Sequence, residues 1–396
     1  PPHLLLLPLL LILLSFFHLH GNPQRSNVQV TSRIAPAIGL IYKGEANIDE
    51  YEKKTIDKAF YKNHYYTDKP IGFSFLLLPS VSALRLSGLD QSNFKDLISS
   101  VSLLTIPPIV LSGSLMLRSL SKVLYSARFA SACVFIAYGF GSIMFIWANS
   151  LFAHCLSAFL VILEVFLLSK IIKIFASEQT HSKESTNRIS SLSMSFGLTA
   201  GFFVSVEYQS VILSTLLILA FIAITYKTHL SSTLNIVSKP SKILLFGASG
   251  ALIGMFPMFL YNVCIYGNPF HISYSNVVGF EGMKSGLFGI GFPSFKNLWS
   301  LLFGEYRGLF IFNPVSLASF LGFCFFLFRP LAFQGARVKF IFISTCLTFL
   351  FYLYINSSYF YWDGGASTGP RHLIPAAGIS MIFVGSLAQV ITDIPN

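Results

Sequence analysis

Residues 209–227 read QSVILSTLLILAFIAITYK, an apolar run that carries no charge before its final lysine. A helix of about 20 such residues crosses the hydrocarbon core of a bilayer. Runs of this kind recur along the chain, and the candidate spans are 3–20, 97–117, 127–147, 149–169, 190–207, 209–227, 243–263, 309–328, 339–355 and 373–392, with a weaker run at 71–89. The sequence therefore predicts an all-α, polytopic transmembrane protein with about 10–11 spanning helices.

The composition agrees with a chain whose surface lies mostly in lipid. Only 11% of the 396 residues are charged, whereas soluble globular chains carry roughly 25%. The formal net charge of +11 is compatible with nucleic-acid binding, but the chain has no dense basic run that would follow a phosphate backbone. Lysine and arginine also accumulate in the cytoplasmic loops of membrane proteins. We therefore expect membrane lipids, and no nucleic acid, among the partners.

The N-terminal apolar run, from Pro1 to His20, admits two interpretations. It lacks the basic segment and the A-x-A cleavage site of a secretory signal peptide, and further spans follow it. We interpret it as the first transmembrane helix, and we treat 1–396 as a single transmembrane domain.

The basic loops predict how the helices are oriented. In chain order they contain Arg118, Lys122 and Arg128, then Lys170, Lys173, Lys183 and Arg188, then Lys227, Lys239 and Lys242, then Arg329, Arg337 and Lys339. All of them lie on one side if the spans from 97 onward alternate, and we expect that side to be cytoplasmic. The alternation requires that 71–89 does not cross, so we predict a re-entrant or interfacial helix there.

The opposite side then receives the loop 21–96, which is expected to hold juxtamembrane helices, and the loops 264–308 and 356–372. Most of the polar residues that could carry chemistry lie in these three loops. We therefore expect a multi-pass protein of the cytoplasmic (inner) membrane whose active site lies on the outer, extracytoplasmic face.

The first outer loop supplies candidate acids and one candidate cation. The stretch 33–42 is apolar with helical spacing, which is typical of a helix lying on the membrane surface. The acidic pair Asp49 and Glu50 follows it, and Asp68 and Lys69 form a turn with a proline at the membrane edge. A carboxylate at the membrane edge can act as a general base, and a lysine there can bind a lipid-linked phosphate as a point charge. The alternative is a solvated loop with surface ion pairs.

The last outer loop reads YFYWDGGASTGPRH over residues 359–372. Its glycines permit a bend that would bring Arg371, at the start of a helix, onto a phosphate. Tyr361 and Trp362 would stack on a sugar or belong to an aromatic belt. The loop 264–308 is expected to form a lid of short helices, in which Arg307 is a second phosphate ligand or pairs with Glu305.

One acid stands at the end of a predicted span. Glu207 is costly in that position unless it is paired or functional. His154 begins a helix on the same side, where a structural role is more common. The chain has no GxSxG, HExxH, P-loop or Rossmann fingerprint.

Taken together, these segments resemble the GT-C fold family of polyprenyl-phosphate-sugar-dependent membrane glycosyltransferases, which includes protein O-mannosyltransferases and lipid A aminoarabinose transferases. Its less-studied prokaryotic branch is the most similar. The motifs that carry the resemblance are Ser32-Arg33, Ile48-Asp-Glu-Tyr51, Tyr66-Thr-Asp-Lys-Pro70, Glu207-Tyr208, Tyr261-Asn262 with Gly267-Asn-Pro269, Arg307-Gly-Leu-Phe310 and Trp362-Asp-Gly-Gly-Ala-Ser-Thr-Gly-Pro-Arg371, and they extend over nearly the whole chain.

The resemblance implies a donor and an assignment of roles. The donor would be a polyprenyl-phosphate sugar, and the acceptor a lipid, glycan or protein. Transfer would invert the anomeric centre in one displacement. The base would be Asp49, with Glu50 and Asp68 as rivals, and the donor phosphate would be bound by Lys69, Arg371 and Arg307. The expected substrate-binding residues are Tyr66, Asp68, Glu207, Tyr361, Trp362 and His372. No cofactor is expected. The sequence contains no dense carboxylate cluster that would require a divalent cation, and assistance by such an ion is left as an alternative.

Some features depart from the family pattern. Many relatives have an acid shortly before Ser-Arg, where this chain has Asn27-Val-Gln-Val-Thr31. The chain also stops soon after its last span, whereas relatives often continue, and a truncated C-terminus would account for this. The main alternative function is a transporter or flippase of lipid-linked glycans, which would place ionisable residues near the bilayer midplane. A non-catalytic membrane scaffold is a third.

Overall fold

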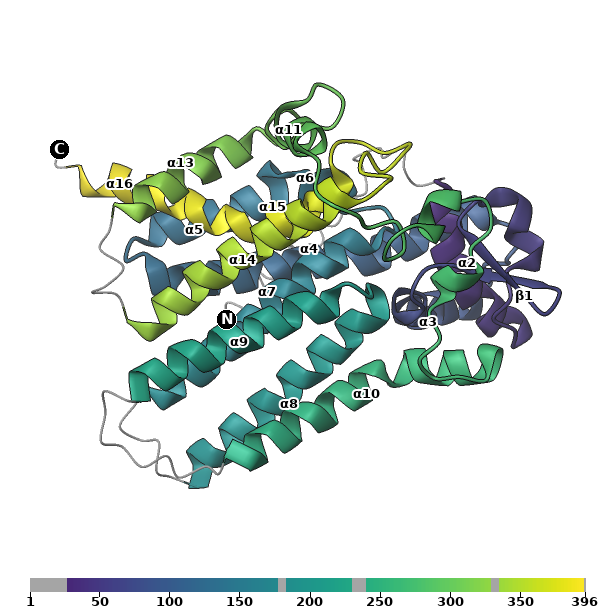
Figure 1. The fold of residues 1–396 in the computed structure, drawn as a ribbon, viewed down its shortest axis with the longest axis horizontal. Helices are drawn as coiled ribbons and strands as arrows, with labels where there is room; N and C mark the ends of the chain where they lie inside the picture. Colours follow the sequence, from purple (N-terminus) through teal and green to yellow (C-terminus); the bar gives the residue numbers. More distant parts are fainter. Residues whose placement is uncertain (1–26, 177–182, 230–239, 329–334, 395–396) are drawn as a thin grey trace.

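The computed structural model describes residues 27–176, 183–229, 240–328 and 335–394, and the predicted first span at 3–20 lies outside them. Within the described residues, six helices are long and apolar enough to cross a membrane: α4 (Phe94–Leu124), α7 (Ala153–Phe175), α8 (Lys183–Val206), α10 (Pro240–Tyr266), α14 (Ala336–Ser358) and the segment Arg371–Asp393. Shorter apolar helices include α9 (Ser210–His229) and α13 (Val315–Leu327). The prediction of an all-α polytopic membrane protein is confirmed (Figure 1).

Some predicted spans are broken rather than continuous. The predicted span 127–147 consists of α5 (Arg128–Ile136), a π-helical turn (Ala137–Gly141) and α6 (Ile143–Trp147). The C-terminal span is divided into η8 (Arg371–Leu373), α15 (Ile374–Ser380), η9 (Met381–Phe383) and α16 (Val384–Asp393). The predicted span 309–328 consists of α12 (Leu309–Phe312) and α13, separated at Asn313. The Asn313 side chain accepts a hydrogen bond from the Ile143 amide at 3.3 Å, so two of the breaks stabilise each other.

Helices α8 and α10 approach each other closely because both carry glycines spaced by four residues. A Cβ atom added at Gly197 would lie 1.9 Å from the Gly247 carbonyl oxygen, and one at Gly201 would lie 2.1 Å from that of Ala251. On α10, Gly250 and Gly254 meet the α8 backbone in the same way. Small residues at this spacing let two membrane helices pack backbone against backbone.

One end of the bundle, which we call the sheet end, holds most of the first loop. It contains α2 (Val28–Lys43), η2 (Asp49–Lys54), the strands β1 (Lys58–Tyr61) and β2 (His64–Thr67), and α3 (Gly72–Leu86). The antiparallel hairpin was not predicted. Its two-residue turn, Lys62 and Asn63, has positive φ at both positions (46° and 65°), as a type I′ turn requires.

The prediction of a helix on the membrane surface at 33–42 is wrong, because every residue of α2 from Gln29 to Gly39 is buried in the protein. The helix packs against α3, which also contacts α4 and α8. At 15 residues α3 is shorter than the roughly 20 residues of a span, and it lies beside α2 (Figure 1). That α3 is re-entrant or interfacial stays a prediction.

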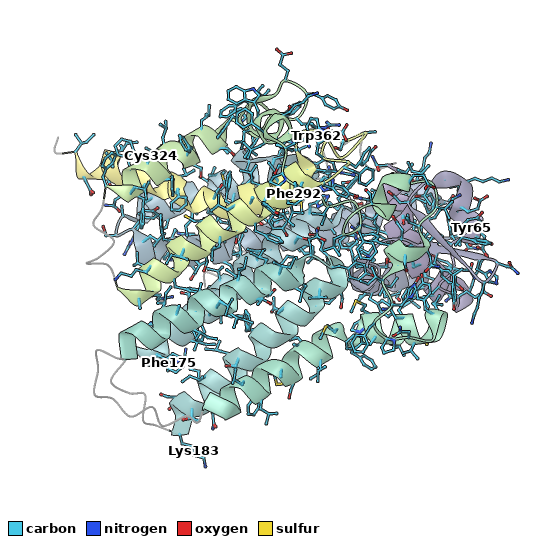
Figure 2. The ribbon with its side chains drawn as sticks, viewed as in Figure 1. Tyr65, Phe175, Lys183, Phe292, Cys324 and Trp362 are labelled. Carbon is cyan, nitrogen blue, oxygen red and sulfur yellow. The ribbon has the colours of Figure 1, made fainter. Side chains whose placement is uncertain are left out.

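The opposite end, which we call the basic end, carries described basic residues of the predicted cytoplasmic side, among them Arg118 and Lys122 at the end of α4, Arg128 at the start of α5 and Lys183 at the start of α8. Figure 1 shows α5 and α16 at this end, and Figure 2 shows Lys183 far from Tyr65 on the hairpin. The predicted lid, 264–308, lies towards the sheet end and contains η5 (Ser273–Asn276), η6 (Glu281–Lys284) and α11 (Phe295–Phe303), so the prediction of short helices is confirmed. The Val278 amide donates to the Lys58 carbonyl at 3.0 Å, which joins this loop to the hairpin.

Candidate active site

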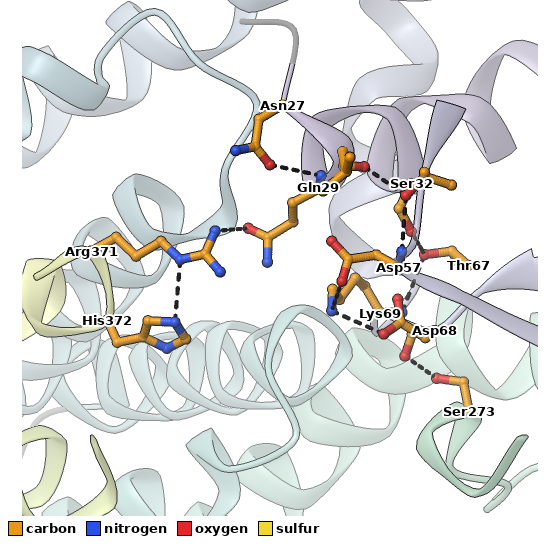
Figure 3. Close-up of polar contacts among 12 residues, drawn as sticks. Asn27, Gln29, Ser32, Asp57, Thr67, Asp68, Lys69, Ser273, Arg371 and His372 are labelled. Carbon is orange, nitrogen blue, oxygen red and sulfur yellow. Dashed lines mark hydrogen bonds and ion pairs between the residues drawn. The ribbon is translucent and has the colours of Figure 1, made fainter. Parts of the chain in front are cut away.

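A cavity of about 290 Å³ lies where the loops of the sheet end meet the bundle. It is bounded by segments that are far apart in sequence: α2, the residues that flank the hairpin, the start of α7, the end of α8, the start of α9, the end of α14, the lid and the last loop. The charged and imidazole side chains that line it are Arg33, Asp57, Lys69, His154, Glu207, Arg371 and His372. The cavity therefore gathers cations and acids where the loops meet the bundle, and Figure 3 shows Asp57, Lys69, Arg371 and His372 among them.

Lys69 occupies the wall formed by the first loop. Its Nζ lies 3.1 Å from Asp57 Oδ1 and 2.9 Å from Asp68 Oδ2, and its side chain is 13% exposed. Burial lowers the pKa of Lys69, but the two carboxylates raise it above its ordinary value, so the amine is charged. The turn is fixed by Thr67, whose Oγ1 accepts the Lys69 amide at 3.1 Å. A charged lysine is thus held against two acids beside the cavity.

The two acids differ in their surroundings. Asp68 is fully buried, and its Oδ1 has no hydrogen-bond partner among the described residues. Burial raises the pKa of Asp68 to about 6, against the opposing effect of Lys69. Asp57 instead lines the cavity, between η2 and β1, and its amide donates to Thr55 Oγ1 at 3.0 Å. Asp57 is therefore the acid of this pair that a ligand can reach.

Two arginines complete the positive wall. Arg371 is buried, lies over the Phe152 ring at 5.2 Å, and donates to His372 Nε2 at 3.2 Å. Its Nη1 is 3.5 Å from Gln29 Oε1. Figure 3 shows Gln29 between Arg371 and the ion pair of Asp57 with Lys69. Arg33 is 4% exposed, and its Nε and Nη1 have no hydrogen-bond partner among the described residues.

No carboxylate of the described residues lies within 4 Å of either guanidinium. A buried guanidinium without an acidic partner is destabilising. An anionic ligand in the cavity would remove that penalty.

Glu207 and His154 form the opposite wall. Glu207 Oε1 lies 3.3 Å from His154 Nδ1, and its Oε2 accepts a hydrogen bond from the Tyr352 hydroxyl at 3.4 Å. Burial raises the pKa of Glu207, but its hydrogen bond with His154 and nearby charges lower it below the ordinary value. The His154 ring packs on His372, with centroids 5.2 Å apart. His154 thus connects Glu207 to the last loop.

The predicted site residues divide into two groups. Lys69, Glu207, Tyr361, Arg371 and His372 line the cavity. Asp49, Glu50, Tyr66, Asp68, Trp362 and Arg307 do not line it.

The contacts of the second group explain where they lie. Asp49 accepts the Tyr65 amide at 2.6 Å and lies 2.6 Å from His64 Nδ1, and Glu50 pairs with Lys43. Asp49 therefore fixes the start of β2. Tyr66 lies on β2 near Tyr266, and Trp362 packs against the main hydrophobic core.

Arg307 holds the last loop in place. It donates to the carbonyl oxygens of Gly365 and Ser367 and, at 3.0 Å, to the Tyr306 hydroxyl. It forms no ion pair with Glu305 among the described residues. These bonds order the glycine-rich segment that precedes Arg371.

Sequence reasoning missed Asp57, Gln29 and Arg33 as residues of the cavity. Asp57 stands in no recognisable motif, and only the pairing of β1 with β2 brings it to Lys69. Gln29 and Arg33 carried a detectable signal, because Arg33 belongs to the Ser32-Arg33 motif that contributes to the family resemblance and Gln29 lies three residues before it. Within the described part of the chain, no group of three or more His, Cys, Asp or Glu residues has the arrangement of a metal site.

These features define a polytopic helical membrane protein with a buried, cation-rich cavity at one end. The chain matches no family model and no curated protein sequence. Two solved structures resemble it, both of ArnT from Cupriavidus metallidurans. The structure bound to undecaprenyl phosphate has 12% identity and a TM-score of 0.60 over 99% of this chain and 60% of that chain. The apo structure has 13% identity and a TM-score of 0.57 over 100% and 61%.

The likeness shows the fold. The GT-C fold expected from the sequence motifs is confirmed by it. The chain spans about three fifths of the length of the ArnT chains that it resembles.

Proposed function

We propose that this protein is an integral membrane glycosyltransferase that transfers a sugar from a polyprenyl-phosphate donor to a lipid, glycan or protein acceptor. The observation that carries the proposal is the set of buried cations around one cavity: Arg33 and Arg371 without acidic partners, and Lys69 beside an accessible acid. Arginine and lysine in such a setting bind phosphate. The fold shared with ArnT, which was solved with undecaprenyl phosphate, supports a lipid-linked phosphate as the ligand.

The proposed mechanism is a single inverting displacement. A base removes the proton from the acceptor hydroxyl, and the acceptor oxygen attacks the anomeric carbon of the donor sugar. The bond between that carbon and the bridging phosphate oxygen breaks on the opposite face of the sugar. The leaving group is a phosphate that is already anionic, so it needs stabilising cations rather than a protonating acid. Lys69, Arg33 and Arg371 would supply them. Arg307 would act indirectly, by holding the segment before Arg371.

We assign the base to Asp57 rather than to Asp49 or Glu50. Asp57 lines the cavity and lies 3.1 Å from Lys69, whereas Asp49 is engaged by the hairpin and Glu50 by Lys43. A donor phosphate that approaches Lys69 would replace Asp57 as its partner and free the carboxylate. Glu207 with His154, and Tyr361 with His372, would then contact the sugar or the acceptor. Tyr66 and Trp362, which do not line the cavity, would support these substrate-contacting residues indirectly.

We further propose that the cavity opens on the outer face of the cytoplasmic membrane. The support is the charge distribution, because the basic loops predicted to be cytoplasmic belong to the opposite end of the bundle.

One observation favours the alternative of a transporter. Glu164 is fully buried within α7, and Ser214 of α9 donates to its Oε1 at 2.7 Å. An intramembrane acid is a marker of ion or proton pathways. Glu164 does not line the cavity, however, and the cavity's own charges cluster at one end of the spans. The enzyme proposal therefore accounts for more of the charged residues.

The decisive experiment is lipid and glycan mass spectrometry of a deletion strain, complemented with wild type or with Asp57→Asn. An enzyme predicts that one sugar disappears from the envelope while one polyprenyl-phosphate sugar accumulates, and that Asp57→Asn behaves like the deletion. Purified protein mixed with the accumulated donor and an envelope extract should then restore the missing sugar. Transfer that proceeds without the protein, while the donor accumulates only on the cytoplasmic leaflet of the deletion strain, would instead identify a transporter.

A further inference from the structure

A second charged cavity lies at the basic end, far from the candidate active site. It has a volume of about 620 Å³ and lies between the end of α4 and the start of α5. Arg118 and Lys122 of α4, Arg128 and Ser131 of α5, and Ser126 of the linker line it. No aspartate or glutamate lines it. Three cations therefore face one space without an acid.

These three cations also lack acidic partners outside the cavity. Within the described ranges, none of them has a carboxylate oxygen within 4 Å. The Nε of Arg118 is buried and has no hydrogen-bond partner among the described residues. Three like charges repel one another across a partly enclosed space, and an anion between them would reverse the sign of that energy.

The sequence explains why the cations converge. Arg118 and Lys122 are four residues apart, so they lie on the same face of α4. The chain then reverses through a short linker that is fixed to α16, because the Tyr125 hydroxyl lies 2.9 Å from Ser386 Oγ and the Ala127 amide donates to Gln389 Oε1 at 2.9 Å. The helix α5 begins directly after the linker, at Arg128. Its start has no side-chain cap, and the positive end of its dipole adds to the local charge.

We propose that this cavity binds a phosphate group, supplied either by the headgroup of an anionic phospholipid in the adjacent leaflet or by free phosphate. The site lies at the end of a 31-residue apolar helix, where lipid headgroups meet a membrane protein. Serine hydroxyls beside the cations would complete the hydrogen bonding of the phosphate oxygens. This site is separate from the proposed donor site and does not depend on the proposed reaction.

The test is native mass spectrometry of the full chain in detergent, titrated with phosphatidylglycerol or phosphatidylcholine, with and without millimolar inorganic phosphate. The variant is Lys122→Gln/Arg128→Gln, in which both replaced side chains are exposed, so that the fold is not at risk. The matched control is Lys173→Gln/Arg188→Gln, which removes two exposed cations predicted to lie on the same side. Arg118→Gln is measured separately.

We expect the wild type and the control to retain one phosphatidylglycerol at concentrations where the variant retains none, with a loss of affinity of about tenfold or more. Phosphatidylcholine should bind all three proteins equally. Resistance to inorganic phosphate identifies the lipid headgroup as the source, and displacement by it identifies free phosphate. Equal phosphatidylglycerol and phosphate binding by the wild type and both cavity variants would overturn the proposal.

Discussion

The two charged cavities of this protein differ in one respect that separates a site for chemistry from a site for binding. At the sheet end, Lys69 lies against Asp57, and a buried histidine lies against Glu207. At the basic end, Arg118, Lys122 and Arg128 share a cavity with no acid. Both arrangements attract phosphate, but only the first also holds a carboxylate that could take a proton from a reacting hydroxyl. The acid beside the cation is therefore the informative feature.

The cations of the two cavities also differ in how deeply they are buried. Arg33, Lys69 and Arg371 are largely buried, and electrostatic interactions are stronger there than at the surface. Lys122 and Arg128 are exposed, so water and salt screen them. We expect substitutions at the sheet end to change rates by orders of magnitude and those at the basic end to change only lipid binding.

The largest effect is expected for Asp57→Asn. Loss of a general base lowers a rate by roughly 10²–10⁴-fold, and removal of a negative charge beside Lys69 should leave donor binding unchanged or stronger. Initial rates of sugar transfer and donor affinity, measured on the same preparation, check this. The matched control is Asp49→Asn, which should stay within about fivefold of the wild-type rate because Asp49 does not line the cavity. The reverse ranking of the two variants would return the base role to Asp49.

The next largest effect concerns the cations. Lys69→Gln and Arg371→Gln should each weaken donor binding by roughly 10- to 100-fold, because a hydrogen bond to a charged group is worth about 1.5–3 kcal/mol. Equilibrium binding of a polyprenyl-phosphate lipid reports this directly. Arg307→Gln serves as a comparison, since Arg307 contacts loop carbonyls rather than the cavity. Its loss should lower thermal stability more than donor affinity, and the opposite outcome would make Arg307 a phosphate ligand.

Helix packing offers a way to disturb the sheet end alone. In Gly197→Ala the new Cβ would meet the Gly247 carbonyl at 1.9 Å, whereas in Gly247→Ala it would meet only the Ser193 carbonyl at 3.8 Å. Overpacking costs roughly 1–3 kcal/mol, so Gly197→Ala should lower the apparent Tm by several degrees and Gly247→Ala should not.

The helix α10 leads into the lid of the cavity. Gly197→Ala should therefore weaken donor binding while leaving phosphatidylglycerol binding at the basic end intact. Equal apparent Tm values for the two glycine variants would show that α8 and α10 are not in backbone contact.

A smaller effect is expected from the titration of Asp68. Its folded-state pKa of about 6 is raised above the ordinary value, so the folded protein holds this proton more tightly than the unfolded chain. Asp68 therefore contributes stability that is fully present at pH values below the ordinary pKa of an aspartate and is lost as the pH rises through about 6. Asp68→Asn removes this contribution. The apparent Tm of the wild type, minus that of the variant, should fall between pH 4.5 and pH 7, and a constant difference would contradict the assignment.

The smallest effect is expected from Lys122→Gln/Arg128→Gln on sugar transfer. Both residues lie at the end opposite the candidate active site, so the transfer rate in detergent should stay within about twofold of the wild type. Initial rates with a saturating donor check this. A tenfold loss of the transfer rate would show that the two cavities are coupled.

Much of the fold was accessible to sequence reasoning because membrane spans depend on local composition. The runs at 97–117, 149–169 and 339–355 became α4, α7 and α14 with shifted ends. The breaks at Ala137–Gly141 and at Asn313 were missed, since the Ile143 amide that follows the first break finds its acceptor on the Asn313 side chain, 170 residues away in the sequence. The hairpin was also missed, although the residues at its turn, Lys62 and Asn63, can adopt positive φ.

For the site, the sequence by itself indicated two of the three cations that line the cavity, Lys69 and Arg371, but not Arg33. Lys69 and Arg371 were expected beside a phosphate because one stands in a turn at the membrane edge and the other follows a glycine-rich loop at a helix start, and because the family resemblance implies that role. The sequence also predicted that the basic loops share one side, provided that the spans from 97 onward alternate.

Only the tertiary structure decided which acid meets Lys69. Asp49 and Asp57 are both acids of the same loop, and no local property separates them. The register of β1 on β2 leaves Asp57, which precedes β1, 3.1 Å from Lys69, which follows β2. Asp49 instead lies in η2, which packs against β2, and it accepts the Tyr65 amide. The convergence of Arg33, Glu207 and Arg371 on one cavity has the same origin, because contacts between distant segments are set by how helices and loops pack rather than by the composition of any one segment.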